Sequence, residues 1–487
     1  MNTISPIDAA FLQMESRRTP MHVGGLLVFQ LPDHVPRDFL RDLWDRMRTM
    51  PFMPPPFNCR IRPAGLRRLL PTWEPVDFDI DYHLRHSALP YPGGERELGI
   101  LVARLHSHPM DMTRPLWECH LIEGLENNRF ALYFKAHHCA IDGMAAMKLV
   151  RNWLSEDPHD LSGPSAGTVK RNEQPTREPL SFRSRLLKPV TFAGTQIRSA
   201  RELIHTLRAM SLPGMDSGMR AAIATPRSLF NVPVSQQRRL GTQVLDLPRI
   251  KAIGAATGTT VNDVLLEICG SAMRRYLLER GALPTHSLMA SVPVGLARQD
   301  GQSGNAVAGF VCPMGTDIDD PVQRLSNIHE ISTLNKDALH AMSPSALMQF
   351  TLLGLSPLIL GQMTGTLAKL PPFFNVTVSN VVASKVPLYL RGAKLEAMYP
   401  MSILFDGYAL NVTLVGYCDT VAVGFTGCRD AIPSLQRLAV YTGEALPELE
   451  RAIGIKMPAK RHAAHAKASS GTTTERKPRA KPTRTAS

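Results

Sequence analysis

The stretch KAHHCAIDGMAAMKLV, from Lys135 to Val150, places two adjacent histidines just ahead of an aspartate and a glycine. It continues the apolar run RFALYFKAHH, which is typical of a buried strand, and leads into GMAAMKLVRNWLSE, whose apolar residues have helical spacing. The stretch therefore predicts a strand, a tight turn and a helix. Because neutral imidazole accepts protons near pH 7, this turn is a candidate site for a general base.

The other polar residues of the turn fit a supporting role. Only one of two adjacent strand residues can point into a given pocket, so one histidine is expected to act and the other to organise the turn. Asp142 is expected to cap the helix or to hold a cation or a histidine in place, and Gly143 to let the backbone pass closely. No GxSxG elbow accompanies the base, and nothing around Cys139 indicates an activated thiol.

Metal binding is the other chemistry that histidines suggest. The remaining histidine pairs of the first half, in DYHLRH and RLHSHPMD, match neither HExxH nor a Cys/His ligand spacing. We therefore expect no metal site, and hydrogen-bonded structural histidines are the simpler interpretation.

Strands and helices alternate along the rest of the chain. MHVGGLLVFQL, FFNVTVSNV, ALNVTLVGYCD and TVAVGFTG have the patterns of strands. SPIDAAFLQME begins a helix with Ser5 as N-cap and Pro6 in the first turn, and VNDVLLEICGSAMRRYLLERG is a helix that Gly281 stops. With 487 residues, of which 44% are hydrophobic, the chain is predicted to form two α+β halves of similar size.

The net charge of +13 is unevenly distributed. Residues 166–239 carry +9 and residues 456–487 carry +8, so the rest of the chain carries −4. This pattern favours contact with an anionic surface such as a membrane and does not indicate nucleic-acid binding; a solubilising role for the basic segments is the alternative. The final segment has little to bury and is expected to be disordered, and the middle one is expected to be a partly helical linker.

Compartment and membrane contact can also be judged from composition. The seven cysteines are scattered without a CxxC pair, and the start of the chain has no secretory signal pattern, which predicts reduced thiols in a cytosolic protein. Residues 338–368 contain no Asp, Glu, Lys or Arg, but prolines and polar residues interrupt them. We expect a buried or surface-dipping helix there and no transmembrane span.

Several ordered motifs together resemble one family. HHCAIDG matches the HHxxxDG signature of the bacterial wax ester synthase/diacylglycerol acyltransferases, a signature shared with chloramphenicol acetyltransferase-like enzymes and condensation domains. The similarity runs from about residue 2 to 450 and includes SPIDAAFLQMESRRTPMHVGGLLVF, HLRHSALPYPGG, PLWECHLIEGL, TTVNDVLLEICG, SVPVGLARQDGQSGNAVAG and the segment from Asn375 to Tyr417. One departure is SNVVA at 379–383, where the family resemblance leads us to expect an Asn-Val-Pro-Gly-Pro-like run.

The resemblance implies an α/β fold of two chloramphenicol acetyltransferase-like domains with an active-site channel between them. On this basis residues 1–160 are the first domain, 161–240 a basic crossover linker, 241–455 the second domain and 456–487 a tail. The implied activity is transfer of a long-chain acyl group from acyl-CoA to diacylglycerol or a long-chain fatty alcohol, without a cofactor. The implied location is the cytoplasmic face of the inner membrane or the surface of lipid inclusions.

The resemblance also implies residue roles. His138 is the expected general base, with His137, Asp142 and Gly143 as its support and Arg298 as a partner for Asp142. Asn262 and Asp263 are expected to shape the site or its oxyanion side, although Asn262 as a helix N-cap is the alternative. Pro115, Leu116 and Trp117 are expected to contact substrate.

Two other functions remain open at this point. A condensation-type acyltransferase would keep the fold and use a different acceptor. A non-catalytic protein that coats lipid granules would use the basic segments and the apolar helix, but it has no need for a base.

Overall fold

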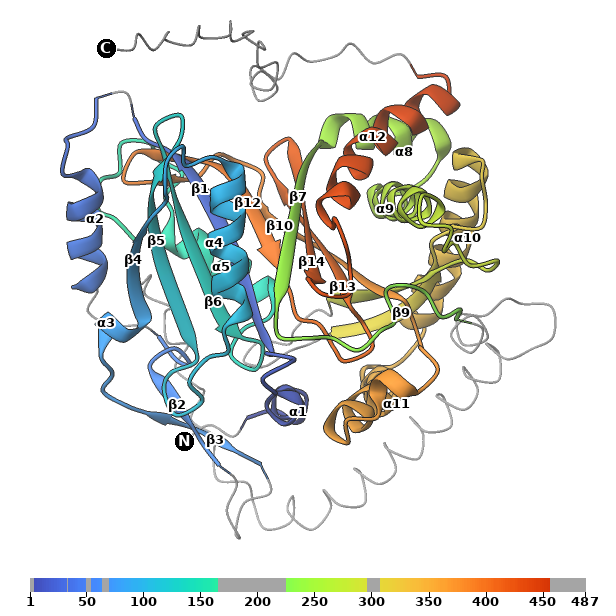
Figure 1. Ribbon diagram of the computed structural model, residues 1–487, viewed down its shortest axis with the longest axis horizontal. Coiled ribbons are helices and arrows are strands. Elements are labelled where there is room, and N and C mark those ends of the chain that lie inside the picture. Colours follow the sequence, from blue (N-terminus) through green and yellow to red (C-terminus); the bar gives the residue numbers. More distant parts are fainter. Residues whose placement is uncertain are drawn as a thin grey trace, which may run out of the picture.

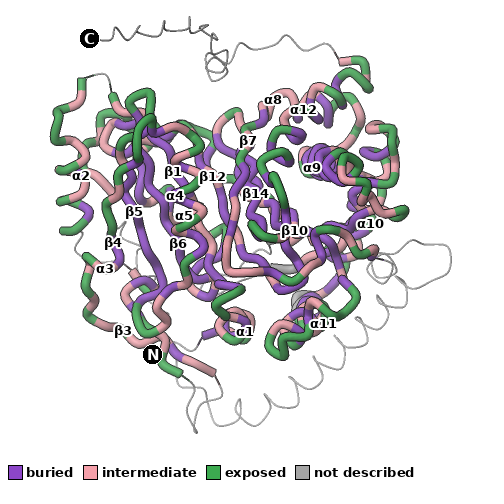
Figure 2. The backbone as a smooth tube through the Cα atoms, in the orientation of Figure 1, coloured by how far each residue is buried: buried purple, intermediate pink, exposed green. Residues whose placement is uncertain are grey.

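The computed structural model describes residues 4–32, 34–49, 54–63, 70–164, 225–295 and 307–455. Two six-stranded sheets dominate this part of the chain, and helices cover their outer faces (Figure 1). The central strands of the two sheets are mostly buried, whereas the outer helices alternate between buried and exposed residues (Figure 2). The mixed α/β architecture predicted from the sequence is confirmed.

The first sheet has the order β11-β12-β1-β6-β5-β4. Its strands are β1 (His22–Gln30), β4 (Leu84–Ala88), β5 (Trp117–Leu125), β6 (Arg129–His137), β11 (Tyr389–Leu390) and β12 (Ala393–Met401). All neighbours are antiparallel except β4 and β5. β6 lies in the centre and all nine of its residues are buried, so its C-terminal end holds the first histidine rigidly.

Helices pack on both faces of this sheet. They are α1 (Pro6–Met14), α2 (Phe39–Arg48), α3 (Ile80–His83), α4 (Glu95–Ser107) and α5 (Gly143–Trp153), and a small hairpin is formed by β2 (Cys59–Arg62) and β3 (Thr72–Pro75). Alternation along the strands explains the two cores: Leu27 and Leu132 face α5, whereas Leu26 and Tyr133 face α4.

The second sheet has the order β7-β14-β13-β10-β8-β9. Its strands are β7 (Arg238–Asp246), β8 (Met289–Gly295), β9 (Val307–Pro313), β10 (Val376–Ser384), β13 (Leu410–Tyr417) and β14 (Thr420–Cys428). The helices of this half are α8 (Leu247–Thr257), α9 (Val261–Leu278), α10 (Pro321–His340), α11 (Pro344–Met363), the short 3-10 helix η1 (Leu367–Lys369) and α12 (Gln436–Ala452). The largest hydrophobic core lies between this sheet and α9, α10 and α12.

The boundary between the two sheets does not coincide with the predicted domain boundaries along the chain. β12 lies within the segment 241–455, yet it pairs with β1 over seven residue pairs and so completes the sheet of the first half. β7 begins at Arg238, inside the predicted linker 161–240, whose residues 165–224 lie outside the described part, as does the tail 456–487. The domain boundaries therefore remain predictions, and the two halves are interlocked by β12.

The uncharged stretch 338–368 forms the end of α10, then α11 and η1. α11 contains Pro357 and lies at the lower edge of the molecule, beside α1 (Figure 1). Among the helices of the described residues, none combines the length and the apolar character needed to cross a membrane.

Candidate active site

The two histidines lie where β6 ends. The His137 amide donates a hydrogen bond to Leu116 O (3.1 Å), and the His138 amide donates one to Met21 O (2.8 Å), so both neighbouring chain segments hold the strand end. The Ala140 amide then donates to His137 O (2.8 Å), which closes the turn before α5 begins at Gly143. The predicted succession of strand, turn and helix is confirmed.

His138 is placed against an aromatic ring from the start of the chain. Its imidazole stacks on Phe11 of α1, with ring centroids 4.2 Å apart and planes 11° from parallel. Burial, with a smaller contribution from the charge of His137, lowers the pKa of His138 to about 4, although a backbone hydrogen bond and the charge of Asp142 oppose the shift. The ring is therefore neutral at physiological pH and can accept a proton.

His137 faces a carboxylate that the sequence did not reveal. Its Nε2 lies 3.4 Å from Glu15 Oε2, and its Nδ1 accepts a hydrogen bond from the Cys139 amide (3.1 Å). Glu15 follows α1 directly and also accepts a hydrogen bond from the Met21 amide. The carboxylate thus joins the end of α1, the start of β1 and the turn. It lies in the resembling segment SPIDAAFLQMESRRTP, which was its only sequence signal.

The environment of Cys139 does not favour its thiol as a nucleophile. The thiol is buried, and burial raises its pKa well above the usual value. A protonated thiol is a poor nucleophile, so His138 stays the predicted reactive group of the turn.

Asp142 and Gly143 fix the beginning of α5. Asp142 is the N-cap, and its Oδ1 accepts a hydrogen bond from the Ala145 amide (2.7 Å), as the capping prediction required. A Cβ on Gly143 would lie 3.1 Å from Val381 Cγ1 of β10, so this glycine allows the helix to approach the second half closely. Arg298, the predicted partner of Asp142, lies outside the described residues.

Asn262 lies in the first turn of α9, but it is not the N-cap. Thr260 caps this helix, so the alternative interpretation of Asn262 as a cap is wrong. Asn262 Oδ1 instead accepts a hydrogen bond from Asn380 Nδ2 (2.8 Å) on the surface. Asn380 belongs to SNVVA, the run that departs from the family pattern, and β10 continues through that run as a strand.

Consecutive residues of β10 therefore meet both predicted parts of the site. Asn380 contacts Asn262 of α9, and Val381 lies against Gly143 of α5. An oxyanion role for Asn262 stays a prediction.

Asp263 is buried and has a different environment. Its carboxylate accepts hydrogen bonds from His329 Nδ1 (2.8 Å), Ser332 Oγ (2.6 Å) and the Thr260 amide (3.0 Å). Burial alone would raise its pKa, but the hydrogen bonds from Ser332, His329 and Thr260 outweigh burial and lower it. These contacts tie α9 to α10 and support a structural role.

The Pro115-Leu116-Trp117 element lies behind the histidines at the start of β5. Trp117 is buried, donates from Nε1 to Phe57 O (2.8 Å) and stacks on His83 at 4.7 Å. Leu116 is buried and supplies the carbonyl that the His137 amide binds. The element thus supports the strand that carries the site, and its contact with substrate stays a prediction.

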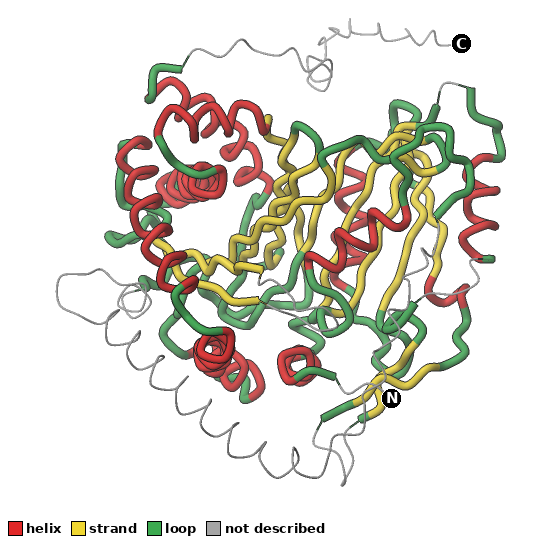
Figure 3. Tube along the Cα trace, turned by 180° about the vertical axis from the view of Figure 1, so that it is seen from behind, coloured by secondary structure: helices red, strands yellow, loops and turns green. Residues whose placement is uncertain are grey.

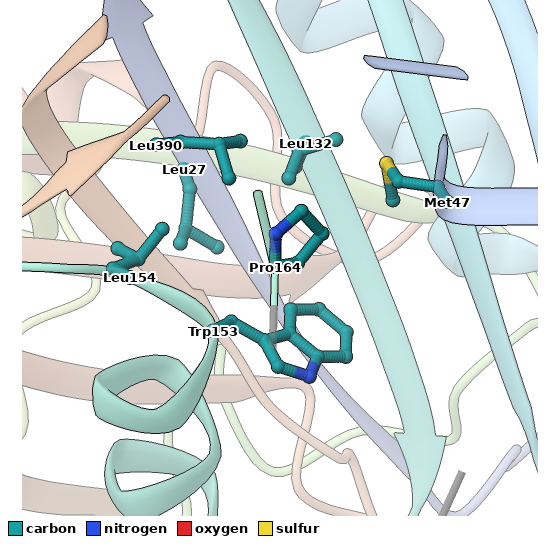
Figure 4. A pocket seen from close by; sticks show the side chains of 7 residues that line it. All are labelled: Leu27, Met47, Leu132, Trp153, Leu154, Pro164 and Leu390. Carbon is teal, nitrogen blue, oxygen red and sulfur yellow. The ribbon is translucent and has the colours of Figure 1, made fainter. Parts of the chain in front are cut away.

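An apolar pocket lies at the other end of α5 (Figure 4). It is narrow and partly open to solvent. Its lining is entirely apolar in surface: Leu27, Met47, Leu132, Trp153, Leu154, Pro164 and Leu390. Because α5 rises about 1.5 Å per residue, its eleven residues separate this pocket from the histidine turn by about 16 Å.

Comparisons with known proteins identify relatives of this chain. The model of the wax ester synthase/diacylglycerol acyltransferase catalytic domain matches residues 4–265, and that of the WS/DGAT C-terminal domain matches residues 303–450. A putative diacylglycerol O-acyltransferase of Mycobacterium tuberculosis is 51% identical over 93% of this chain and 99% of its own length. The O-acyltransferase WSD of Acinetobacter baylyi is 36% identical over 93% and 98% of the two chains.

Solved structures extend the comparison to the fold. The wax ester synthase/diacylglycerol acyltransferase of Marinobacter aquaeolei VT8 superimposes with a TM-score of 0.74 and 37% identity, over 93% of this chain and all of that one. The first condensation domain of the calcium-dependent antibiotic synthetase shares the fold, with a TM-score of 0.58 at 17% identity. The chain belongs to the wax ester synthase/diacylglycerol acyltransferase family.

Proposed function

We propose that the protein transfers a long-chain fatty acyl group from acyl-CoA to the hydroxyl of diacylglycerol or of a long-chain fatty alcohol. The products are triacylglycerol or a wax ester, together with free CoA. The observation that carries the proposal is the half-buried, neutral His138, which directly follows β6 and stacks on Phe11. The family of the chain and the names of its relatives support acyl transfer to oxygen.

In the proposed mechanism, His138 acts as general base. It accepts the hydroxyl proton while the acceptor oxygen attacks the thioester carbonyl, the C–O bond forms and the C–S bond breaks, and the proton passes to the departing thiolate. A group with a pKa of about 4 has little drive to hold a proton, so transfer from the hydroxyl must be coupled to bond formation. The same low pKa favours release of the proton to CoA.

The neighbouring residues orient this base. Glu15 and the Cys139 amide fix the His137 ring, and Asp142 fixes the start of α5, so the His138 backbone is held from both sides. We assign positioning roles to His137, Asp142 and Gly143. Asn262 is the proposed contributor to the oxyanion side, and the reaction uses no cofactor beyond its acyl-CoA substrate.

Apolar surface suits the long acyl chain. Each buried methylene contributes about 0.8 kcal/mol, so a chain of many methylenes binds largely through apolar area. We propose that catalysis occurs at the surface of the inner membrane or of lipid inclusions, where such acceptors reside.

The test is thiol release from palmitoyl-CoA by purified full-length protein, with hexadecanol or dioleoylglycerol as acceptor. We expect release that depends on the acceptor and that falls about 10²- to 10⁴-fold in His138→Ala. His86→Ala is the matched control, because His86 lies on β4 in the same sheet and outside the histidine turn.

Two results would contradict the proposal. Near-normal thiol release by folded His138→Ala would show that His138 is not the general base. Absence of release by the folded wild-type protein with either acceptor would favour another acceptor or a lipid-binding role.

A further inference from the structure

The outer face of α11 is unusually apolar for a surface. Leu353 is 54% exposed, Leu360 63% and Met363 51%, and Leu352 is also exposed. Leu353, Leu360 and Met363 are seven and three residues apart, so they lie along one side of the helix. Polar Ser356 and Thr364 on this exposed side carry no charge.

The inner face of α11 is firmly seated on α1. Ile359 packs against the cluster of Ala10 and Met14, and Gln362 Nε2 donates to Thr19 Oγ1 (2.7 Å). α1 and α11 lie side by side at the lower edge of the molecule in the front and rear views (Figures 1 and 3). α1 also supplies the Phe11 ring that stacks on His138. α1 therefore contacts both α11, which carries the apolar face, and His138.

Basic residues border this face. Lys369 is exposed at the end of η1, and Arg227 is exposed beside it, donating to the carbonyls of Lys369 and Leu370 (3.0 and 2.8 Å). Leu370 is itself exposed between them. Exposed Arg17 lies three residues after the end of α1, the helix against which α11 packs. α11 itself contains no charged residue in twenty positions.

We propose that this face of α11 docks on the surface of an anionic lipid bilayer and thereby brings α1, whose Phe11 stacks on His138, close to the lipid that holds the acceptor. A partly buried helix with leucines outward and cations at its border matches the apolar depth and the negative headgroups of such a surface. A protein partner would be expected to find hydrogen-bonding groups across the contact, and the α11 face offers few. The link to acceptor delivery rests on the proposed function.

The test uses full-length protein and vesicles of phosphatidylcholine and phosphatidylglycerol, with partitioning measured by sedimentation. The variant Leu353→Gln/Leu360→Gln removes the outer leucines and retains helix-favouring side chains. Leu278→Gln/Val440→Gln is the matched control, because these residues are 51% and 53% exposed on α9 and α12. Measuring at about 0.5 M NaCl screens the contribution of the basic segments.

We expect partitioning to fall about tenfold in the α11 variant and to change less than about twofold in the control. At low salt, Lys369→Gln should weaken binding to anionic vesicles more than binding to neutral ones. Equal partitioning of the α11 variant and the wild-type protein would overturn the proposal. If partitioning is equal and sedimentation velocity shows a dimer for the wild-type protein but a monomer for the α11 variant, the face is instead a contact between two copies.

A soluble acceptor separates this proposal from the proposed function. Thiol release with hexanol should be the same in the α11 variant and the wild-type protein, whereas release with vesicle-embedded dioleoylglycerol should fall in parallel with partitioning. If no acceptor supports thiol release, the proposed function fails, and the partitioning result still decides the docking face.

Discussion

Burial gives His138 a pKa of about 4, and this fixes the pH range in which it can act as a base. The ring is neutral above that pKa and becomes protonated, and therefore inactive as a base, as pH falls through it. We expect kcat/KM for thiol release to stay level from about pH 8 to 5 and to fall only toward pH 4, whereas an exposed histidine titrates near 6.5. Circular dichroism at each pH provides the control for unfolding. An acidic limb centred near 6.5 would contradict the burial argument.

Glu15 offers a second test at the scale of single residues. Its carboxylate contacts both His137 Nε2 and the Met21 amide, so Glu15→Ala removes two supports of the turn. We expect kcat to fall about tenfold or more with KM little changed, because a hydrogen bond to a charged group contributes about 1.5–3 kcal/mol. Glu15→Gln, which keeps an acceptor for Met21, should lose less.

The control for this prediction is Glu123→Ala, which removes an exposed carboxylate beside His86 on the same sheet. Unfolding midpoints of all three variants show whether the loss reflects stability. A fall in stability with unchanged kcat would make Glu15 purely structural.

The sequence predicted the histidine turn because strand and helix periodicities meet there within one short stretch. Asp142 as helix cap was predictable for the same reason, since its hydrogen bond is local. Glu15 was not, because its partner belongs to a distant strand and no local pattern connects them.

At the scale of elements, α5 and β10 meet at one tight contact. A Cβ on Gly143 would lie 3.1 Å from Val381 Cγ1, so Gly143→Val should overpack the contact and cost about 1–3 kcal/mol in the free energy of unfolding. Because α5 begins directly after the histidine turn, activity should fall too. Val381→Ala makes room, so the double variant should recover stability and thiol release.

The measurement is a double-mutant cycle by chemical denaturation, read beside thiol release. Residues in contact show interaction energies of about 0.5–3 kcal/mol, and we expect a favourable one here. Simple additivity of the two substitutions would mean that α5 does not depend on this contact.

Helices with strong periodicity were predicted well. The contacts that polar residues make at the ends of these helices were not. The expected helix beginning at Val261 is observed as α9, but its cap proved to be Thr260, and Asn262 turned to Asn380. The hydrogen bonds of Asp263 to side chains of α10 were likewise not predicted. Periodicity states which face of a helix is apolar, but it does not state which neighbour a polar residue meets.

At the scale of the whole molecule, the pairing of β1 with β12 was beyond sequence reasoning. Both strands have ordinary strand patterns, and such patterns do not specify a partner hundreds of residues away. The two-halved architecture was predictable from the alternation of elements. The contribution of β12 to the sheet of the first half was not.

Because β12 completes the first sheet, we predict that the first half does not fold alone. A fragment of residues 1–164 lacks β11 and β12, so one side of β1 would expose unpaired backbone groups, and Leu27 and Phe29 would lose Ala393 and Leu395 from their core. We expect the fragment to bind a hydrophobic dye and to unfold without a cooperative transition. Coexpression with residues 165–487 should restore a cooperative transition and thiol release, because the second fragment carries the missing strands. A cooperatively folded 1–164 fragment would show that β12 is dispensable to the first sheet.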